Sequence, residues 1–324
     1  LLARTLDNED LTIQHDHAPE AWLLRNGATL EVLGAQTHDI IVNDTSRVTL
    51  DNATVTRQAA TMSAYAMAVL DNATAIARNT RFAAGGLWVA GDARAELIGS
   101  SITVAADAPG LGDNSRTAWG LSLNNNNPGA PGIPRVLLDA STITVADRAD
   151  QSHYSSGIGA YMRAGELTLR NNSSVDAANV GVIVHSSVTA DHAVKLHLDN
   201  SRINAGRGAA IEVAAQNDAA NTVDIVIANG STLDSGDGTL LRVHAYGDTA
   251  TSGYTDVNVT VDDSRLQGDI HFDDTWMQGR VDVVLRNHAA VSGRFINVSS
   301  ASVSTGSTWT LTGDSSVGHL DLLA

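Results

Sequence analysis

The sequence predicts an all-β fold, a right-handed parallel β-helix of about twelve to fourteen coils with three short strands in each coil. A six-residue phrase recurs along the chain, for example at Leu50–Val55, Leu138–Ile143 and Leu198–Ile203. From Leu138 onward, successive copies start 24 to 34 residues apart, at 138, 169, 198, 227, 261, 285 and 311. A run of alternating apolar and polar residues leads into most copies. Repetition at this period is typical of a solenoid, in which each repeat contacts only its neighbours.

The alternating run predicts one strand of each coil. In Val194–Leu198, apolar residues stand at every second position, with Lys195 and His197 between them. Because successive side chains of a strand point to opposite faces, we expect Leu196 and Leu198 to point into the coil. Lys195 and His197 then point toward solvent.

Corners and two further strands complete the expected coil. An Asn, Asp or Gly follows the alternating run, and these residues adopt the left-handed backbone at low cost. A third strand follows the corner, and another precedes the alternating run, as at 86–89, 180–184, 209–213 and 269–272. The expected corner residues are Asn52, Asn72, Gly99, Asn171, Asn200, Asn229, Asn287 and Gly313.

Interruptions of the repeat predict loop excursions from a single β-helix domain that covers residues 1–324. Short ones lie at 185–193 and 273–280, and the four that we expect to matter most lie at 105–133, 146–156, 214–222 and 244–256. Insertions in a solenoid form surface loops, often on its binding face. We therefore expect partner contacts there, and we expect deletion of 244–256 to leave the thermal transition nearly unchanged.

Composition excludes several classes of function. The 324 residues carry a formal net charge of −16, which argues against binding nucleic acid or an anionic membrane surface. The chain has no cysteine, so it forms neither a disulfide nor a thiolate metal site. It contains no run of 18 apolar residues that would span a bilayer. Leu1 begins without a leader sequence, and we expect the chain to be the middle portion of a longer protein.

Three groups of residues could carry chemistry, and each has a simpler interpretation. Gly313–Ser316 contains a Gly-Asp-Ser sequence, but a serine nucleophile needs an oriented histidine. His15 and His17 could bind a metal, but no third ligand is evident. The pairs Asp262-Asp263 and Asp273-Asp274 could supply carboxylates for glycoside chemistry, although aspartate is expected at corners. We expect no catalytic, cofactor-binding or metal-binding residues.

Aromatic residues beside the excursions are the candidate partner-binding residues, because exposed aromatic side chains commonly anchor protein interfaces. For Trp119 the alternative is that it fills the coil interior, as Trp88 also could. The candidates are Trp119, Tyr154, Tyr246, Tyr254 and Trp276.

The C-terminal segment carries the most specific pattern. Residues 309–322 read Trp-Thr-Leu-Thr-Gly-Asp-Ser-Ser-Val-Gly-His-Leu-Asp-Leu. This order of Trp, Leu, a turn, Ser-x-Val and Leu-x-Leu resembles the end of the pertactin-like passenger domain of Gram-negative autotransporters, the type V secretion proteins. Segments 86–102 and 266–270 are also similar to it. The resemblance implies a right-handed β-helix that is followed, in the full-length chain, by a folding-competence region and a translocator barrel absent from this sequence.

The resemblance also implies a function. Passengers of this family are commonly adhesins, so we expect a non-catalytic virulence factor that binds a host cell-surface or matrix protein. It would lie on the extracellular face of the outer membrane or be secreted after transit through the periplasm. An alternative is immune evasion by capture of a soluble serum protein, such as a complement or protease regulator. A third is a β-helical polysaccharide lyase or hydrolase. The sequence departs from the family pattern in lacking an Arg-Gly-Asp triplet and a serine-protease domain.

Overall fold

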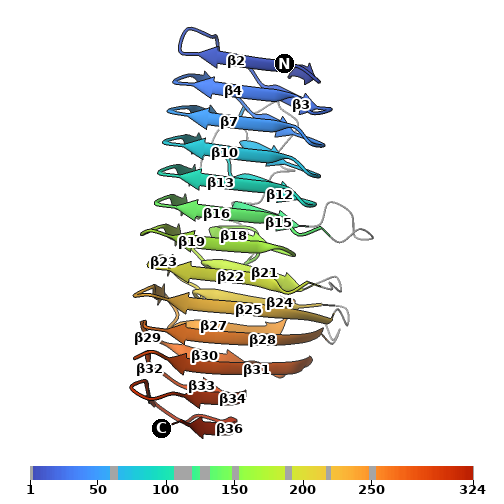
Figure 1. Cartoon of the computed structure of the whole chain (residues 1–324). Helices are drawn as coiled ribbons and strands as arrows, with labels where there is room; N and C mark the ends of the chain where they lie inside the picture. The colour runs from blue at the N-terminus through green and yellow to red at the C-terminus, as the bar shows by residue number, and fades with distance from the viewer. Residues whose placement is uncertain are drawn as a thin grey trace. The chain divides into compact units, whose positions relative to one another are not determined.

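The chain folds as a parallel β-helix in a computed structural model (Figure 1). The structure describes residues 3–58, 65–105, 119–124, 132–147, 153–186, 192–216, 220–247 and 253–323. These ranges contain strands β1 to β36 and no helix. Strands that neighbour one another in a sheet come from successive coils and pair in parallel, with three strands in each coil. The expected fold class is confirmed.

Sheets A and B contain two of the three strands of each coil. In sheet order, sheet A consists of β1 (Arg4–Asp7), β3 (Trp22–Arg25), β6 (Ile40–Val42), β9 (Met67–Val69), β12 (Leu87–Ala90), β15 (Trp119–Asn124), β18 (Ile158–Met162), β21 (Val182–Ser186), β24 (Ile211–Ala215), β27 (Thr239–Ala245), β30 (Asp269–Phe272) and β33 (Phe295–Ile296). Sheet B consists of β2 (Asp10–Gln14), β4 (Thr29–Leu33), β7 (Arg47–Asp51), β10 (Thr74–Arg78), β13 (Arg94–Ile98), β16 (Arg135–Asp139), β19 (Glu166–Arg170), β22 (Val194–Asp199), β25 (Ala220–Ala228), β28 (Gly253–Asp262), β31 (Met277–Arg286), β34 (Val298–Val303) and β36 (Val317–Leu322).

The third strands of the coils form two separate sheets. Sheet C consists of β5 (Gln36–Thr37), β8 (Thr54–Thr56), β11 (Arg81–Ala83), β14 (Ser101–Val104), β17 (Thr142–Val145), β20 (Ser174–Ala177), β23 (Arg202–Ala205) and β26 (Thr232–Ser235). Sheet D consists of β29 (Arg265–Gln267), β32 (Ala290–Ser292) and β35 (Thr308–Thr310). No strand pairing joins β26 to β29 in the described residues, so both are edge strands.

The chain divides into two compact units. Unit 1 is Leu1–Tyr161 with Val175–Ala178, and unit 2 is Met162–Ser174 with Asn179–Ala324. In unit 1, Trp22 is fully buried and the Arg4 guanidinium lies 5.2 Å from its ring centroid. The Glu20 carboxylate lies 3.8 Å from the Arg4 guanidinium and 2.8 Å from the His17 imidazole. These contacts pack polar side chains of the first coil against Trp22 in β3.

Columns of aliphatic side chains fill the interior of both units. On the inner face of sheet B in unit 2, each residue of one column is in register with the next. The column consists of Leu169, Leu198, Ile227, Val261, Leu285 and Val303, all buried. Lys195 and His197 are exposed on the opposite face, as the alternation predicts. Burial of this apolar surface supplies the main favourable free energy of folding.

Left-handed corners end the strands of sheet B. Positive φ occurs at six expected corner residues, namely Asn52, Gly99, Asn171, Asn200, Asn229 and Asn287. The expectation is wrong at Asn72 and Gly313, where φ is not positive. The segment around Asn72 copies the corner phrase, but it lies between sheets A and B, and the left-handed residue there is Asp71. Similar short sequences therefore form two different corners of the coil, one after sheet B and one between sheets A and B.

Buried hydroxyl groups stack behind the corner that follows sheet B. In unit 1, the Thr80 N–H donates to Ser100 Oγ at 3.1 Å, and the Ser100 N–H donates to Ser141 Oγ at 3.0 Å. In unit 2, the Ser173 N–H donates to Ser201 Oγ at 3.2 Å, and the Ser201 N–H to Ser231 Oγ at 3.0 Å. These bonds satisfy N–H groups that the corner removes from the sheets.

Strands occupy parts of three of the four main expected excursions. Range 105–133 contains β15, and its segments 106–118 and 125–131 lie outside the described residues. Range 214–222 includes parts of β24 and β25, and range 244–256 includes the end of β27 and the first four residues of β28. Within 146–156, residues 148–152 lie outside the described residues. Deleting 244–256 would remove strand residues such as the fully buried Thr255, so we now expect that deletion to destabilise the coil.

Candidate functional site

Two of the five candidate aromatic residues pack against the fold in unit 1. Trp119 stacks on Tyr161 with ring centroids 4.1 Å apart, and its Nε1–H donates to the Tyr154 carbonyl at 2.9 Å. Tyr154 is half-buried and meets His153 edge to face. Trp119 is also half-buried, and it lies on Tyr161 rather than standing free. The Trp119 ring is therefore held by Tyr161 and by the backbone of Tyr154, whereas the Tyr154 ring contacts its neighbour His153.

Tyr246 packs in a similar way in unit 2. Its ring stacks on that of His185 at 4.0 Å, and His185 is 2% exposed. The pKa of His185 is lowered from 6.5 to about 4, chiefly by burial and further by the positive charge of Arg163. A hydrogen bond with Gln216 raises the pKa but does not outweigh these two effects. The imidazole is therefore neutral near pH 7, which suits a stacked ring in an apolar site.

Tyr254 and Trp276 are the two candidates that remain exposed, at 39% and 56%. Tyr254 is the second residue of β28, and Trp276 directly precedes β31. These strands pair over ten residues, and the Gly253 N–H donates to the Trp276 carbonyl at 3.2 Å. Pairing therefore brings the two aromatic residues to the same end of neighbouring strands.

The backbone at Trp276 is left-handed, with φ of 64°. A bulky side chain seldom adopts this conformation, and such strain collects at functional sites. A tight turn holds it: the Asp273 carboxylate accepts from the Thr275 N–H at 3.1 Å, and the Asp274 carbonyl accepts from the Met277 N–H at 3.2 Å. The turn thereby fixes an exposed tryptophan in place.

Charged residues lie beside this pair on the outer face of sheet B. Arg280, in register with Asp256, donates to Asp282 at 3.0 Å. Burial alone would raise the pKa of Asp282, but hydrogen bonds from Arg280 and Ser300 outweigh it and hold the pKa below its ordinary value. We call the surface of Tyr254, Trp276 and Arg280 the aromatic patch. Sequence reasoning missed Arg280, although its place in the alternating run 277–286 marks it as outward-facing.

The aspartates considered for glycoside chemistry hold structural contacts instead. Asp262 accepts from Asn287 and Arg286 at 2.9 and 2.8 Å, and these hydrogen bonds, that of Asn287 first, lower its pKa. Asp263 lies at a corner, where its backbone is left-handed with φ of 45°. Burial would raise the pKa of Asp273, but hydrogen bonds from Thr275 and the charge of Arg242 lower it. The carboxylates of Asp262 and Asp273 thus hold a corner and a turn, and the backbone of Asp263 forms a corner.

The serine and histidine motifs also have structural partners. Ser315 Oγ accepts from the Phe295 N–H at 3.2 Å, and Ser316 Oγ accepts from the Asn297 N–H at 2.8 Å. His15 lies exposed in a turn, and His17 contacts Glu20. In the ranges that the structure describes, no three His, Asp or Glu side chains gather as metal ligands.

The C-terminal pattern forms the last strands of sheets D and B. Trp309 in β35 stacks on Phe295 at 4.2 Å, and its Nε1–H donates to the Gly293 carbonyl at 3.0 Å. β36 pairs with β34, which places Leu320 and Leu322 beside Ala301 and Val303. Leu320 and Leu322 are 45% and 74% exposed. Trp309, Leu320 and Leu322 thus occupy inner-face positions of a coil, whereas Leu311 follows β35 and is exposed.

Comparison with solved structures finds similar chains, one of them an autotransporter. The crystal structure of the autotransporter UpaB from E. coli strain CFT073 matches with a TM-score of 0.48 and 16% identity, over 98% of this chain and 77% of that chain. No family model and no curated protein matches. The β-helix assignment rests on the strand pairing of this chain itself. Among the described residues, no helix has the length and apolar character needed to cross a bilayer.

Proposed function

We propose that this chain is the passenger of a type V secretion protein, displayed at the bacterial surface or secreted, and that it acts as a non-catalytic adhesin. Two features support the proposal. The order of residues in 309–322 resembles the end of pertactin-like passengers. The chain also has the three-strand coils that this resemblance implies.

The aromatic patch is the observation that carries the binding role. Large exposed aromatic side chains with an arginine beside them are the residue types most enriched in the energetic centres of protein interfaces. Tyr254 and Trp276 place two such exposed rings at the same end of neighbouring strands, and the turn holds the backbone of Trp276. A partner would meet a fixed surface, which lowers the entropy cost of binding.

Binding of the purified chain to cultured epithelial cells and to matrix proteins tests this function. We expect Trp276→Ala with Tyr254→Ala to lower the apparent affinity at least tenfold, since residues of this kind contribute about 2 kcal/mol or more each at interface centres. Leu311→Ala is the control, because Leu311 is 57% exposed outside the patch. Equal binding by the double variant and the control would overturn the role of the patch.

Two further measurements separate the alternatives. Enrichment of one serum protein by the immobilised chain, without binding to cells, would replace adhesion by capture of a soluble host protein. Release of reducing or unsaturated ends from glycosaminoglycan or pectin would contradict the non-catalytic assignment.

A further inference from the structure

Two corners of the chain contain the sequence Asn-Gly, which occurs nowhere else in it: Asn26-Gly27 in unit 1 and Asn229-Gly230 in unit 2. The backbones of the two turns match, because both asparagines have φ of 56° and the glycines have φ of 79° and 78°. In each turn, the N–H after the glycine donates to the carbonyl before the asparagine at 3.2 Å. A difference in reactivity between the two folded sites therefore depends on what surrounds each turn.

An asparagine that precedes a glycine can lose its side-chain amide without a catalyst. The glycine nitrogen attacks Cγ of the asparagine, the Cγ–Nδ2 bond breaks, and the amide leaves as ammonia with the proton of the glycine N–H. Water then opens the five-membered imide and leaves either aspartate or isoaspartate. Glycine favours the reaction because it has no Cβ to obstruct the approach. The glycine nitrogen must also be free to move toward Cγ.

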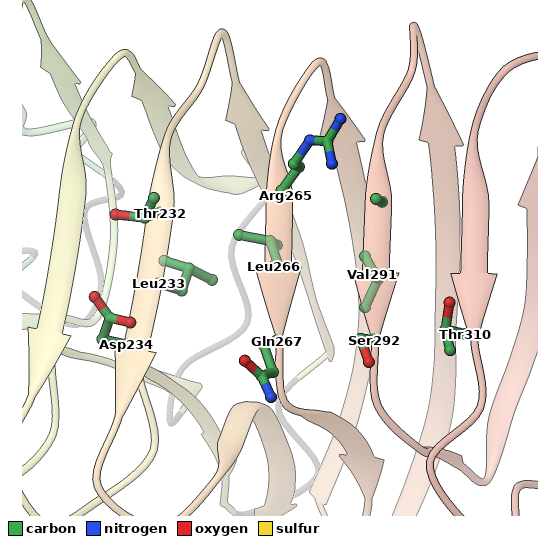
Figure 2. Close-up of a pocket in the computed structure, with 10 residues that line it drawn as sticks. Thr232, Leu233, Asp234, Arg265, Leu266, Gln267, Val291, Ser292 and Thr310 are labelled. Carbon is green, nitrogen blue, oxygen red and sulfur yellow. The ribbon is translucent and has the colours of Figure 1, made fainter.

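The attacking nitrogen is held at one site and free at the other. The Gly230 N–H donates to the Asp263 carbonyl, on the corresponding corner of the next coil, at 2.7 Å. Figure 2 shows β26 and β29, the strands that follow these two corners. The Gly27 N–H, by contrast, has no hydrogen-bond acceptor within the described chain. Attack at Asn229 therefore requires a hydrogen bond to break first, and attack at Asn26 does not.

The side-chain amides of the two asparagines have matching contacts. Asn26 Nδ2 donates to Asp7 Oδ1 at 2.8 Å, and Asn229 Nδ2 donates to Asp199 Oδ1 at 2.9 Å. Both asparagines are exposed, so water reaches either imide. The hydrogen bond of the glycine N–H is thus the contact at the reacting atoms that distinguishes the two sites.

We propose that Asn26 is a site of spontaneous deamidation and that the hydrogen bond of the Gly230 N–H protects Asn229. The modification needs only water and mildly alkaline conditions, which help the glycine nitrogen to lose its proton. It concerns a corner of unit 1 and does not depend on the proposed adhesion.

Deamidation should weaken the corner between β3 and β4. The Asn26 side chain donates to Asp7, and its backbone N–H donates to Asp44 at 3.0 Å, so the new carboxylate stands between two aspartates. The hydrogen bond from Asn26 is also the largest of the contributions that lower the pKa of Asp7. Like charges this close repel each other, and isoaspartate additionally lengthens the main chain by one carbon atom.

Peptide mapping by mass spectrometry of the whole chain, aged in mildly alkaline buffer, tests the proposal. We expect Asn26 to convert about fivefold faster than Asn229, the factor that a typical net hydrogen bond contributes. Ageing in concentrated urea is the control, because the unfolded chain lacks this hydrogen bond, and the two rates should then be similar. Equal rates in the folded chain, or a preference for Asn26 that persists in urea, would overturn the proposal.

A second measurement tests the effect on the corner. Asn26→Asp reproduces the aspartate product and should lower the thermal midpoint of unfolding. Adding Asp7→Asn places an amide opposite the new carboxylate again and should recover part of the loss. An unchanged midpoint in Asn26→Asp, or no recovery in the double variant, would contradict the predicted repulsion.

Discussion

Single polar residues inside the coils stabilise this fold where one hydroxyl group serves two successive coils. Ser201 is 5% exposed; its Oγ accepts from the Ser173 N–H and donates to the Asp199 carbonyl at 3.0 Å. One hydroxyl thus satisfies backbone groups of two coils. The natural alanines at Ala53 and Ala289 show that the position accepts a methyl group sterically.

Ser201→Ala should therefore lower the free energy of unfolding by about 1–3 kcal/mol, the usual cost of leaving a buried N–H unsatisfied. Urea unfolding followed by circular dichroism measures the change. Ser302→Ala on the outer face of sheet B is the control and should have little effect. If Ser201→Ala lowers the free energy of unfolding no more than Ser302→Ala does, the stacked buried hydroxyl groups add nothing to stability.

His185 should make the stability of unit 2 depend on pH. Its pKa is about 4 in the folded chain and 6.5 ordinarily, so between these values the unfolded chain binds the proton more tightly. The free energy of unfolding therefore falls as the pH drops from about 6.5 to about 4. Protonation of His185 causes no further loss below about pH 4. We expect His185→Gln to lose this part of the pH dependence of the thermal midpoint. His197→Gln, on the exposed face of sheet B, should retain it; identical pH profiles for both variants would contradict the assignment.

At the scale of elements, the strands that alternate strictly were predictable and the others were not. The alternating run Val194–Leu198 predicted β22 correctly because each inward position holds a large aliphatic residue. The first residues of β28 were assigned to a loop because their inward positions hold Gly253 and Thr255, which carry no apolar signal. β15 was missed for a similar reason, since Pro, Gly and Asn surround its six residues.

Leu198 tests the inner column of sheet B. It is fully buried and in register with Leu169 and Ile227. Leu198→Asp should cost several kcal/mol, on the order of 3–5, because it buries an unpaired charge. His197→Asp places the same group on the outer face and should change the unfolding midpoint far less. Similar midpoints for the two variants would refute the inward assignment.

The candidate site was predictable only in part. The sequence marks Tyr254 and Trp276 by their position beside interruptions, and both are exposed. It marks Tyr246 in the same way, yet that ring stacks on His185, from a strand 61 residues earlier. Whether an aromatic residue near a loop is exposed depends on which side chain the coil stacking brings beside it. A single sequence does not contain that information.

At the scale of the whole molecule, stability is a sum of interactions between neighbouring coils. β36 pairs with β34, and its residues Leu320 and Leu322 continue the inner face of sheet B. No further strand packs beside β36 in the described residues, and both leucines are exposed. Exposed apolar residues on an edge strand promote association between copies. We expect Leu320→Ser with Leu322→Ser to reduce self-association of the purified chain in sedimentation experiments, with little change in the unfolding midpoint. Unchanged association would show that this edge is not responsible.

The separation of β26 from β29 has a mechanical consequence. The coils on its two sides are joined by sheets A and B, whereas three sheets join the pairs of coils directly before and directly after this junction. Under tension applied through the termini, fewer backbone bonds share the load at this junction. Stretching a single molecule should therefore rupture this junction, near residues 232–268, before the three-sheet junctions on either side of it, and the length then released would identify the position of the break.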